Sequence, residues 1–215
     1  MIEKIDEGQP DEQKLGSQYL SIMEVGGAYA QVFFNLLDFL QLPALIITDL
    51  DTVDAADNRR KCKVSEGSHS SNACINTWYA PDGEDKPTKD QLLQKAPGEK
   101  VSNARRLAFQ IPHSEGDACG RSFEDAFMLA NPARFDITGE TPAEREEQAW
   151  KAAKDVDKTD FALKYAIEDT DWTTPRYIEQ GLRWLAQCPG TDVPEEETAG
   201  DTPDAKFEGE GGGND

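Results

Sequence analysis

The sequence predicts an α/β fold in which helices flank a parallel sheet. Residues 44–48 form an apolar, β-branched run after Pro43, which is typical of a strand inside a parallel sheet. Residues 28–40 carry apolar side chains at the 3.6-residue period of a helix, and residues 19–25 are expected to form a strand before it. Strand, helix and strand together predict a right-handed βαβ unit.

The composition is strongly acidic. The 215 residues are enough for one domain with an insertion, and they include 42 Asp or Glu against 22 Lys or Arg, a formal net charge of −20. Such a chain does not bind nucleic acid by bulk charge, so DNA binding would need metal ions, a local basic patch or a partner domain. The sequence has no signal peptide and no long apolar run, which predicts a cytoplasmic protein without membrane contact.

The first elements follow from local signals. Residues 1–6 are expected to form the last turns of a helix, and Gly26 and Gly27 to form the turn before helix 28–40. The face of that helix that is predicted to be buried consists of Tyr29, Val32, Phe33, Leu36, Leu37 and Leu40.

Later elements are predicted from capping residues and periodicity. Residues 107–112 alternate apolar and polar side chains, as a strand does. Helices are expected after the capping residues Ser122, Thr141, Asp157 or Thr159, and Thr174, and Pro follows two of these.

These elements predict a division of the chain. Residues 1–135 are expected to form the α/β core, with a polar and partly helical insertion at about 52–103. Residues 136–188 are expected to form a helical region packed on that core. Residues 189–215 are acidic and rich in Gly and Pro, which predicts a disordered tail.

Two aspartates follow the 44–48 strand. Asp49 and Asp51 are two residues apart, so in an extended segment their carboxylates point the same way. The carboxyl end of a parallel strand is where open α/β sheets bind ligands, and carboxylate oxygens suit a hard cation such as Mg²⁺. The pair also fits an ordinary turn, because Asp favours turn positions.

A wider pattern resembles a known family. Its motifs, in order, are Gly26-Gly27, the Ile-Thr-Asp-Leu-Asp that ends at Asp51, Ser71-Asn72 with Trp78, Cys119-Gly-Arg-Ser-Phe-Glu, and Lys158-Thr-Asp-Phe-Ala. Together they resemble the Toprim domain of OLD-family (overcoming lysogenization defect) nucleases, over about residues 1–188. The resemblance implies a Toprim-like sheet and metal-dependent endonuclease cleavage of DNA.

The resemblance also implies site residues. Asp49 and Asp51 would hold one or two Mg²⁺ or Mn²⁺ ions, which lie about 4 Å apart in two-metal sites. Glu124 would add a carboxylate, and Lys158 would stabilise the charge on the phosphate in the transition state. The simpler alternative for Glu124 is an acid that the helix dipole favours at a helix start. The simpler alternative for Lys158 is an exposed lysine at a helix start.

Five further residues are weaker candidates. Arg105, Arg106 and Arg121 are predicted to contact the DNA backbone, with plain surface solvation as the alternative. Ser71 and Asn72 are predicted either to support the site from behind, near metal-bound water or phosphate, or to cap a helix.

The sequence departs from the family pattern in two ways. The acidic motif that should follow the family's first strand is absent, so the chain is expected to be truncated at its N-terminus. OLD proteins also carry an N-terminal ABC-type ATPase, whose Gly-x-x-x-x-Gly-Lys-Ser/Thr motif does not occur here. An ATPase domain outside this chain and a second copy of the chain in a homodimer are the expected partners besides DNA.

Two other functions stay open. Asp49-Leu-Asp-Thr-Val fits a phosphatase of the haloacid dehalogenase type, in which Asp49 is the nucleophile and Asp51 the acid/base. Against this, a βα unit precedes the strand, and no later strand ends in paired aspartates. A chain without the first acidic motif also fits a non-catalytic module for metal binding or dimerisation.

Overall fold

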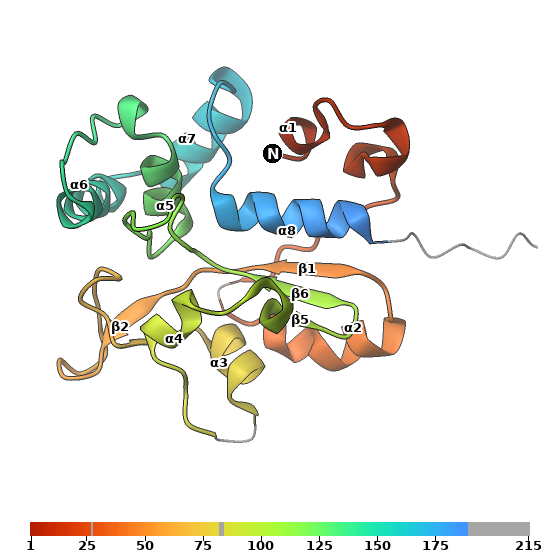
Figure 1. Ribbon diagram of the computed structural model, residues 1–215, viewed down its shortest axis with the longest axis horizontal. Helices are drawn as coiled ribbons and strands as arrows, with labels where there is room; N and C mark the ends of the chain where they lie inside the picture. The colour runs from red at the N-terminus through yellow and green to blue at the C-terminus, as the bar shows by residue number, and fades with distance from the viewer. Residues whose placement is uncertain (27, 82–83, 189–215) are drawn as a thin grey trace, which may run out of the picture.

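A computed structural model of the chain describes residues 1–26, 28–81 and 84–188. Its central sheet has the order β1-β6-β5 and lies between α8 on one face and α2 and α3 on the other (Figure 1). β1 (Ala44–Ile47) runs parallel to β6 (Arg105–Ala108), and β5 (Val101–Ser102) is antiparallel to β6. The predicted α/β class with a parallel pair of strands is confirmed.

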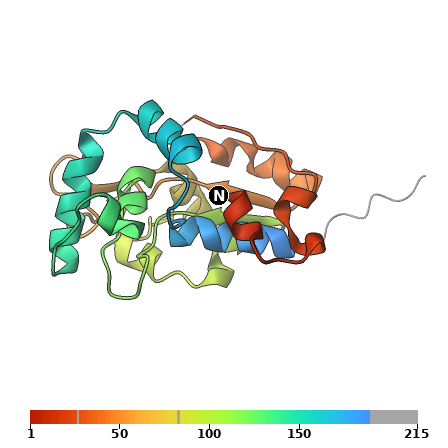
Figure 2. The same cartoon turned by 90° about the horizontal axis from the view of Figure 1, so that it is seen from above.

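The helices cover the sheet and extend beyond one end of it. They are α1 (Ile2–Asp6), α2 (Phe34–Leu40), α3 (Ala73–Tyr79), α4 (Lys89–Leu93), α5 (Phe123–Ala130), α6 (Pro142–Lys154), α7 (Lys158–Leu163) and α8 (Arg176–Gln187). Figure 2 shows α1 beside α8, with α5, α6 and α7 gathered at one end. Within the described ranges no helix is long and apolar enough to cross a membrane.

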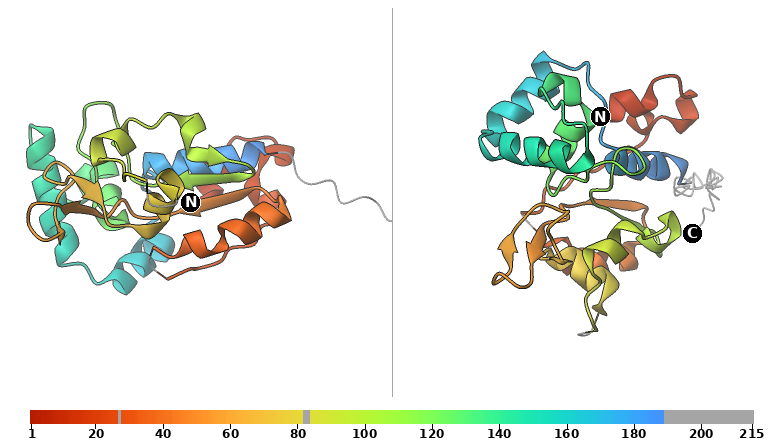
Figure 3. Two further views of the ribbon diagram at one scale, coloured as in Figure 1. Left: turned by 90° about the horizontal axis from the view of Figure 1, so that it is seen from below. Right: turned by 60° about the vertical axis from the view of Figure 1, so that its left-hand side comes forward.

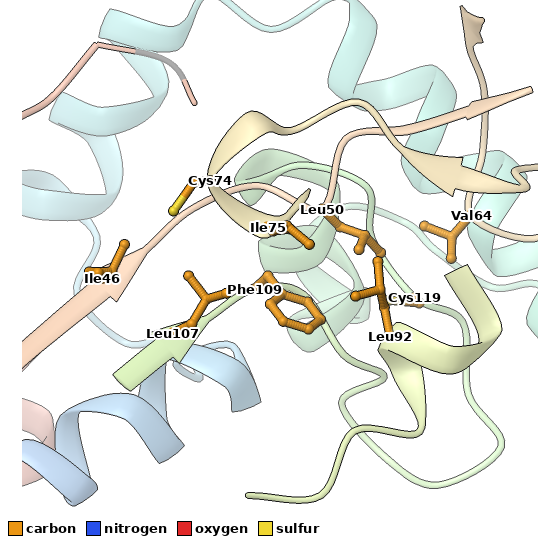
Figure 4. Packing of buried hydrophobic residues seen from close by; sticks show 9 residues of the cluster. All are labelled: Ile46, Leu50, Val64, Cys74, Ile75, Leu92, Leu107, Phe109 and Cys119. Carbon is orange, nitrogen blue, oxygen red and sulfur yellow. The ribbon is translucent and has the colours of Figure 1, made fainter. Parts of the chain in front are cut away.

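Each face of the sheet has its own apolar core. Alternate residues of the parallel strands point to opposite faces, so Ile46 and Leu107 face α3 while Leu45 and Ala108 face α8. Figure 4 shows the core on the α3 side, formed by Ile46, Leu50, Val64, Cys74, Ile75, Leu92, Leu107, Phe109 and Cys119. This core fixes the carboxyl ends of both parallel strands, because Leu50 and Phe109 are fully buried in it.

The helical end of the molecule has a third core, which is rich in aromatic rings. Phe127 of α5 lies at its centre, with ring centroids of Phe161 and Tyr165 at 5.4 and 5.0 Å. Such edge-to-face and tilted pairs add to the burial energy. The core joins α5 to α7, so the residues at the start of these two helices are held near each other.

The segment before β1 differs from the prediction. Residues 19–25 form no strand, and Tyr19, Ile22 and Met23 are exposed. The predicted βαβ unit is therefore wrong for the described residues. Among the described residues β1 pairs only with β6, and its other edge receives no backbone hydrogen bond from residues 19–25. A strand needs such pairing, which the composition of a segment alone does not provide.

The helix at 28–40 is shorter and rotated. A 3₁₀ turn (Ala30–Phe33) precedes α2, and Val32, Leu36 and Leu40 of the predicted buried face are exposed. Leu37 of the predicted face packs on the core, together with Phe34, which was not predicted to be buried. Gly27, half of the predicted Gly-Gly turn, lies outside the described residues.

β1 is an edge strand within the described residues, not an interior one. Of its four residues only Ile46 is buried, and Ile47 keeps 47% of its surface exposed. The apolar sequence predicted burial on both faces, but burial needs neighbours that lie beyond local sequence.

The insertion contains strands that the sequence did not predict. β2 (Thr52–Asp54) pairs with β3 (Arg60–Lys61) and β4 (His69–Ser70) in a small antiparallel sheet, seen from two further sides in Figure 3. Strands of two or three residues are too short to show a period. The division into a core of residues 1–135 and a helical region of 136–188 stays a prediction, and the predicted disordered tail lies outside the described residues.

The later helices start where the capping signals predicted. Thr141 accepts from the backbone N–H of Glu144 at the start of α6, and Asp157 accepts from Thr159 and Asp160 at the start of α7. α7 is shorter than predicted because a π-helical turn (Lys164–Glu168) follows it.

Candidate active site

Asp49 and Asp51 flank the point where the chain leaves β1. Leu50 between them is fully buried, and Asp51 has a left-handed backbone with φ 50°. The segment is therefore not extended through Asp51, as the two-residue spacing had assumed. The turn sends the chain into β2, and both carboxylates remain partly accessible. This conformation needs a residue that tolerates positive φ, which Asp does better than most.

Glu124 and Lys158 come together from α5 and α7. Lys158 Nζ lies 2.9 Å from Glu124 Oε1, and Ser122 Oγ donates to Glu124 Oε2 at 2.8 Å. Glu124 is only 8% exposed, whereas the Lys158 side chain is 77% exposed. The structure thus brings two of the predicted catalytic residues into direct contact.

Arg121 links Asp51 to the loop before α5. Its Nη2 lies 2.7 Å from Asp51 Oδ1, and its Nε donates to the carbonyl of Thr52 at 3.2 Å. The backbone N–H of Asp51 donates to the carbonyl of Arg121 at 3.1 Å. The two segments that supply Asp51 and Glu124 are therefore joined by backbone and side-chain bonds.

The carboxylates are close enough to influence one another. Burial, opposed by a hydrogen bond from Gln110, raises the pKa of Asp49 to about 6, and repulsion from Asp51 and Glu124 adds to the rise. The hydrogen bond to Glu124 raises the pKa of Lys158, with smaller contributions from Asp49 and Asp51. These four groups therefore share one electrostatic environment in which a cation would relieve repulsion.

A fourth carboxylate, Asp125, shapes the loop before α5. It is buried and accepts hydrogen bonds from the backbone N–H groups of Arg121, Ser122 and Ala126. Its oxygens satisfy donors at the helix start, so it holds Glu124 in position rather than facing a ligand.

The donor set suits a hard divalent cation in chemistry, but its oxygens already have partners. Asp51 is paired with Arg121 and Glu124 with Lys158. Among the described residues no three His, Cys, Asp or Glu side chains are gathered closely enough to hold a metal ion. A cation would therefore replace Arg121 and Lys158 as the partner of these carboxylates.

Arg105 and Arg106 lie elsewhere. Both are buried on β6; Arg105 pairs with Asp38 at 2.7 Å, and its guanidinium lies 4.4 Å from the ring centroid of Phe34. The guanidinium of Arg106 lies 6.0 Å from the ring centroid of Trp184. Buried groups in such contacts do not present themselves to a phosphate, so neither is retained as a DNA contact.

Ser71 and Asn72 support the backbone of the aspartate segment. Ser71 Oγ and N–H both donate to the carbonyl of Asp51. Asn72 caps α3, the simpler of its two predicted roles, and its Nδ2 donates to the carbonyl of Asp49 at 2.7 Å. Neither interaction involves a carboxylate oxygen.

Three residues near the site were not predicted from the sequence. Gln110 donates to Asp49 Oδ1 at 2.6 Å and to the phenol oxygen of Tyr177 at 3.2 Å, and Asp125 closes the loop before α5. Gln110 lies within residues 107–112, which were predicted to form a strand, whereas the observed strand β6 ends two residues before it, at Ala108. For Asp125 the Ser-x-x-Asp spacing of a helix cap was visible.

These residues define a class of protein. It has an α/β sheet with two carboxylates after a parallel strand, and two later helices supply a further acid and a lysine. Residues 1–51 match the family model "Overcoming lysogenization defect protein-like, TOPRIM domain", and the match includes Asp49 and Asp51. Residues 1–51 are thus similar to the Toprim domain of this family, and the resemblance found in the sequence is confirmed over that segment.

One curated relative is the protein named Endonuclease GajA, from Bacillus cereus (strain HuB5-5). It is 32% identical over 204 residues, which cover 82% of this chain and 28% of the relative. The chain therefore spans less than a third of that protein's length. No solved structure shows a significant match to the chain.

Proposed function

We propose that the chain is the catalytic part of an OLD-type nuclease that cuts DNA with the help of Mg²⁺ or Mn²⁺. The observation that carries the proposal is that Asp51 and Glu124 lie near enough to Asp49, at the carboxyl end of β1, to raise its pKa, and that Lys158 pairs with Glu124. The relative named as an endonuclease, aligned over 82% of the chain, supports the same activity.

The roles of the residues follow from their surroundings. Asp49, Asp51 and Glu124 would hold the metal, because Asp51 and Glu124 lie near enough to Asp49 to raise its pKa by repulsion. Bound divalent metal would activate water for attack on a phosphodiester and neutralise the leaving oxygen. Once separated from Glu124, Lys158 has a largely exposed side chain whose positive charge can reach a phosphate. Arg121, once separated from Asp51, is the second cation placed for a backbone phosphate contact.

The same proposal includes a further domain, the substrate, the oligomeric state and the cellular location. The relative is more than three times as long as the matched part, which leaves room for the proposed ABC-type ATPase domain. We further propose that the substrate is DNA, that the active form is a homodimer and that the protein is cytoplasmic.

A non-catalytic role for this chain alone is the second candidate. It is favoured by one observation: within the described residues each carboxylate has a protein partner, and no three ligands are gathered for a metal. In that case the chain would bind metal or a partner, and cutting would need further residues.

Plasmid cleavage with Mg²⁺ or Mn²⁺ tests the proposal. The chain, its Asp49→Ala variant and the full-length relative are compared, with Asp57→Asn as a matched control, since Asp57 is an exposed carboxylate paired with Arg60. Cleavage that is lost in Asp49→Ala and kept in Asp57→Asn supports the proposal. Hydrolysis of a small phosphate monoester without DNA cleavage would favour the phosphatase. Metal binding without cleavage by the chain would favour the non-catalytic role.

A further inference from the structure

Gln110 is a fully buried amide beside the candidate site. It follows β6 by two residues, so it lies at the carboxyl end of the strand that runs parallel to β1. Its Oε1 accepts from the backbone N–H of Leu50 at 2.5 Å. Its Nε2 donates to Asp49 Oδ1 at 2.6 Å and to the phenol oxygen of Tyr177 at 3.2 Å. Both N–H groups of the amide and its oxygen are therefore engaged.

These contacts permit one orientation of the amide. Only the carbonyl oxygen of Gln110 can accept from the N–H of Leu50, so the NH₂ group must face Asp49. Asp49 Oδ1 is occupied by this bond, whereas no group in the described part of the chain donates to Oδ2. The carboxylate is thus held through one oxygen while the other is left for a ligand.

We infer that Gln110 is a positioning residue: it fixes the carboxylate of Asp49 through Oδ1 and leaves Oδ2 to bind the divalent cation. This inference rests on the proposed function, in which Asp49 is a metal ligand. Residues that hydrogen-bond to a ligating side chain set its orientation, and their loss typically weakens metal binding about 10- to 100-fold.

Tyr177 extends this support to α8. It lies in the first turn of that helix, is buried, and contacts Gln110 rather than Asp49. Further along α8, Gly181 packs against the side chain of Leu45 in β1, so the helix is fixed to the same strand that leads to Asp49. The position of the amide therefore depends on packing across the sheet.

Titration of the full chain with Mn²⁺ in a calorimeter tests the inference. Gln110→Met keeps a side chain of similar length without the donor, and we expect its Mn²⁺ affinity to fall about 10- to 100-fold. Asn131→Leu is the matched control, because Asn131 is also a buried amide, bonded to Phe127 and Thr173 away from the site. The Asn131→Leu variant should be less stable but should bind Mn²⁺ with the affinity of the unsubstituted chain. Tyr177→Phe, which leaves the bond to Asp49, should weaken binding less than Gln110→Met.

The outcomes separate the inference from the proposed function. Binding that is lost in Asp49→Asn and unchanged in a folded Gln110→Met would overturn the inference alone. No binding by the unsubstituted chain would overturn both. Should Gln110→Met not fold, the side-chain NH₂ signals of Gln110 in the unsubstituted protein give a second reading by NMR. Their movement on adding Mg²⁺ supports the inference, and signals that stay in place at saturating Mg²⁺ overturn it.

Discussion

Replacing Asp49 with Asn should make the folded protein more stable. Asp49 is partly buried beside other carboxylates, and its pKa is raised from 3.8 to about 6, first by burial and then, against a hydrogen bond from Gln110, by repulsion from Asp51 and Glu124. Asn has the same shape and can still accept from Gln110 through its Oδ1. It removes the charge that burial and repulsion disfavour.

The magnitude and its pH dependence follow from the two pKa values. Between pH 3.8 and about 6 the folded state binds more protons at Asp49 than the unfolded state, so stability falls as pH rises through this window. The full difference corresponds to about 3 kcal/mol, an upper limit for the gain in Asp49→Asn above pH 6. Below pH 3.8 the gain should vanish, because the carboxyl is then protonated in both states.

Urea unfolding at pH 4, 5, 6 and 8 measures this gain. Asp57→Asn is the control, because that carboxylate is exposed and lies outside the site. A variant that is less stable than the unsubstituted chain at pH 8, or a gain that is equal at pH 4 and pH 8, would refute the reasoning.

Three further predictions concern single side chains. Lys158→Met should abolish at least about 99% of metal-dependent cleavage, and equal cleavage in a plasmid assay would contradict this. Gly120→Ala should destabilise by at least about 2 kcal/mol in urea, because the new Cβ would lie 2.4 Å from the backbone N of Ala126; unchanged stability would show that the loop can move. Arg105→Ala should cost about 3 kcal/mol by leaving Asp38 without its buried partner, and a loss below about 1 kcal/mol would count against that pairing.

The sequence predicts what is encoded locally. Strand β1, the capped starts of α5, α6 and α7, and the two aspartates after β1 are all found where short-range signals placed them. Each depends on a few adjacent residues, such as the Thr141-Pro142 start of α6. The caps and periods work because their physical causes lie within one turn.

The failures depend on distant neighbours. Residues 19–25 have the composition of a strand but pair with no other strand, so they form no regular element. Arg105 and Arg106 were expected on the surface because they are charged, but aromatic rings and Asp38 accommodate them inside. The bond from Gln110 to Asp49 joins residues 61 positions apart, a pairing that one sequence does not reveal.

The left-handed backbone at Asp51 limits how the site can be altered. Asn fits this conformation but removes the charge, and Gly fits it best but removes the side chain altogether. Glu keeps the charge but is poorly suited to positive φ, and β-branched residues are worse. Lengthening a carboxylate of the proposed metal site is therefore better directed at Asp49, because at Asp51 the reach of the carboxylate is set by the main chain.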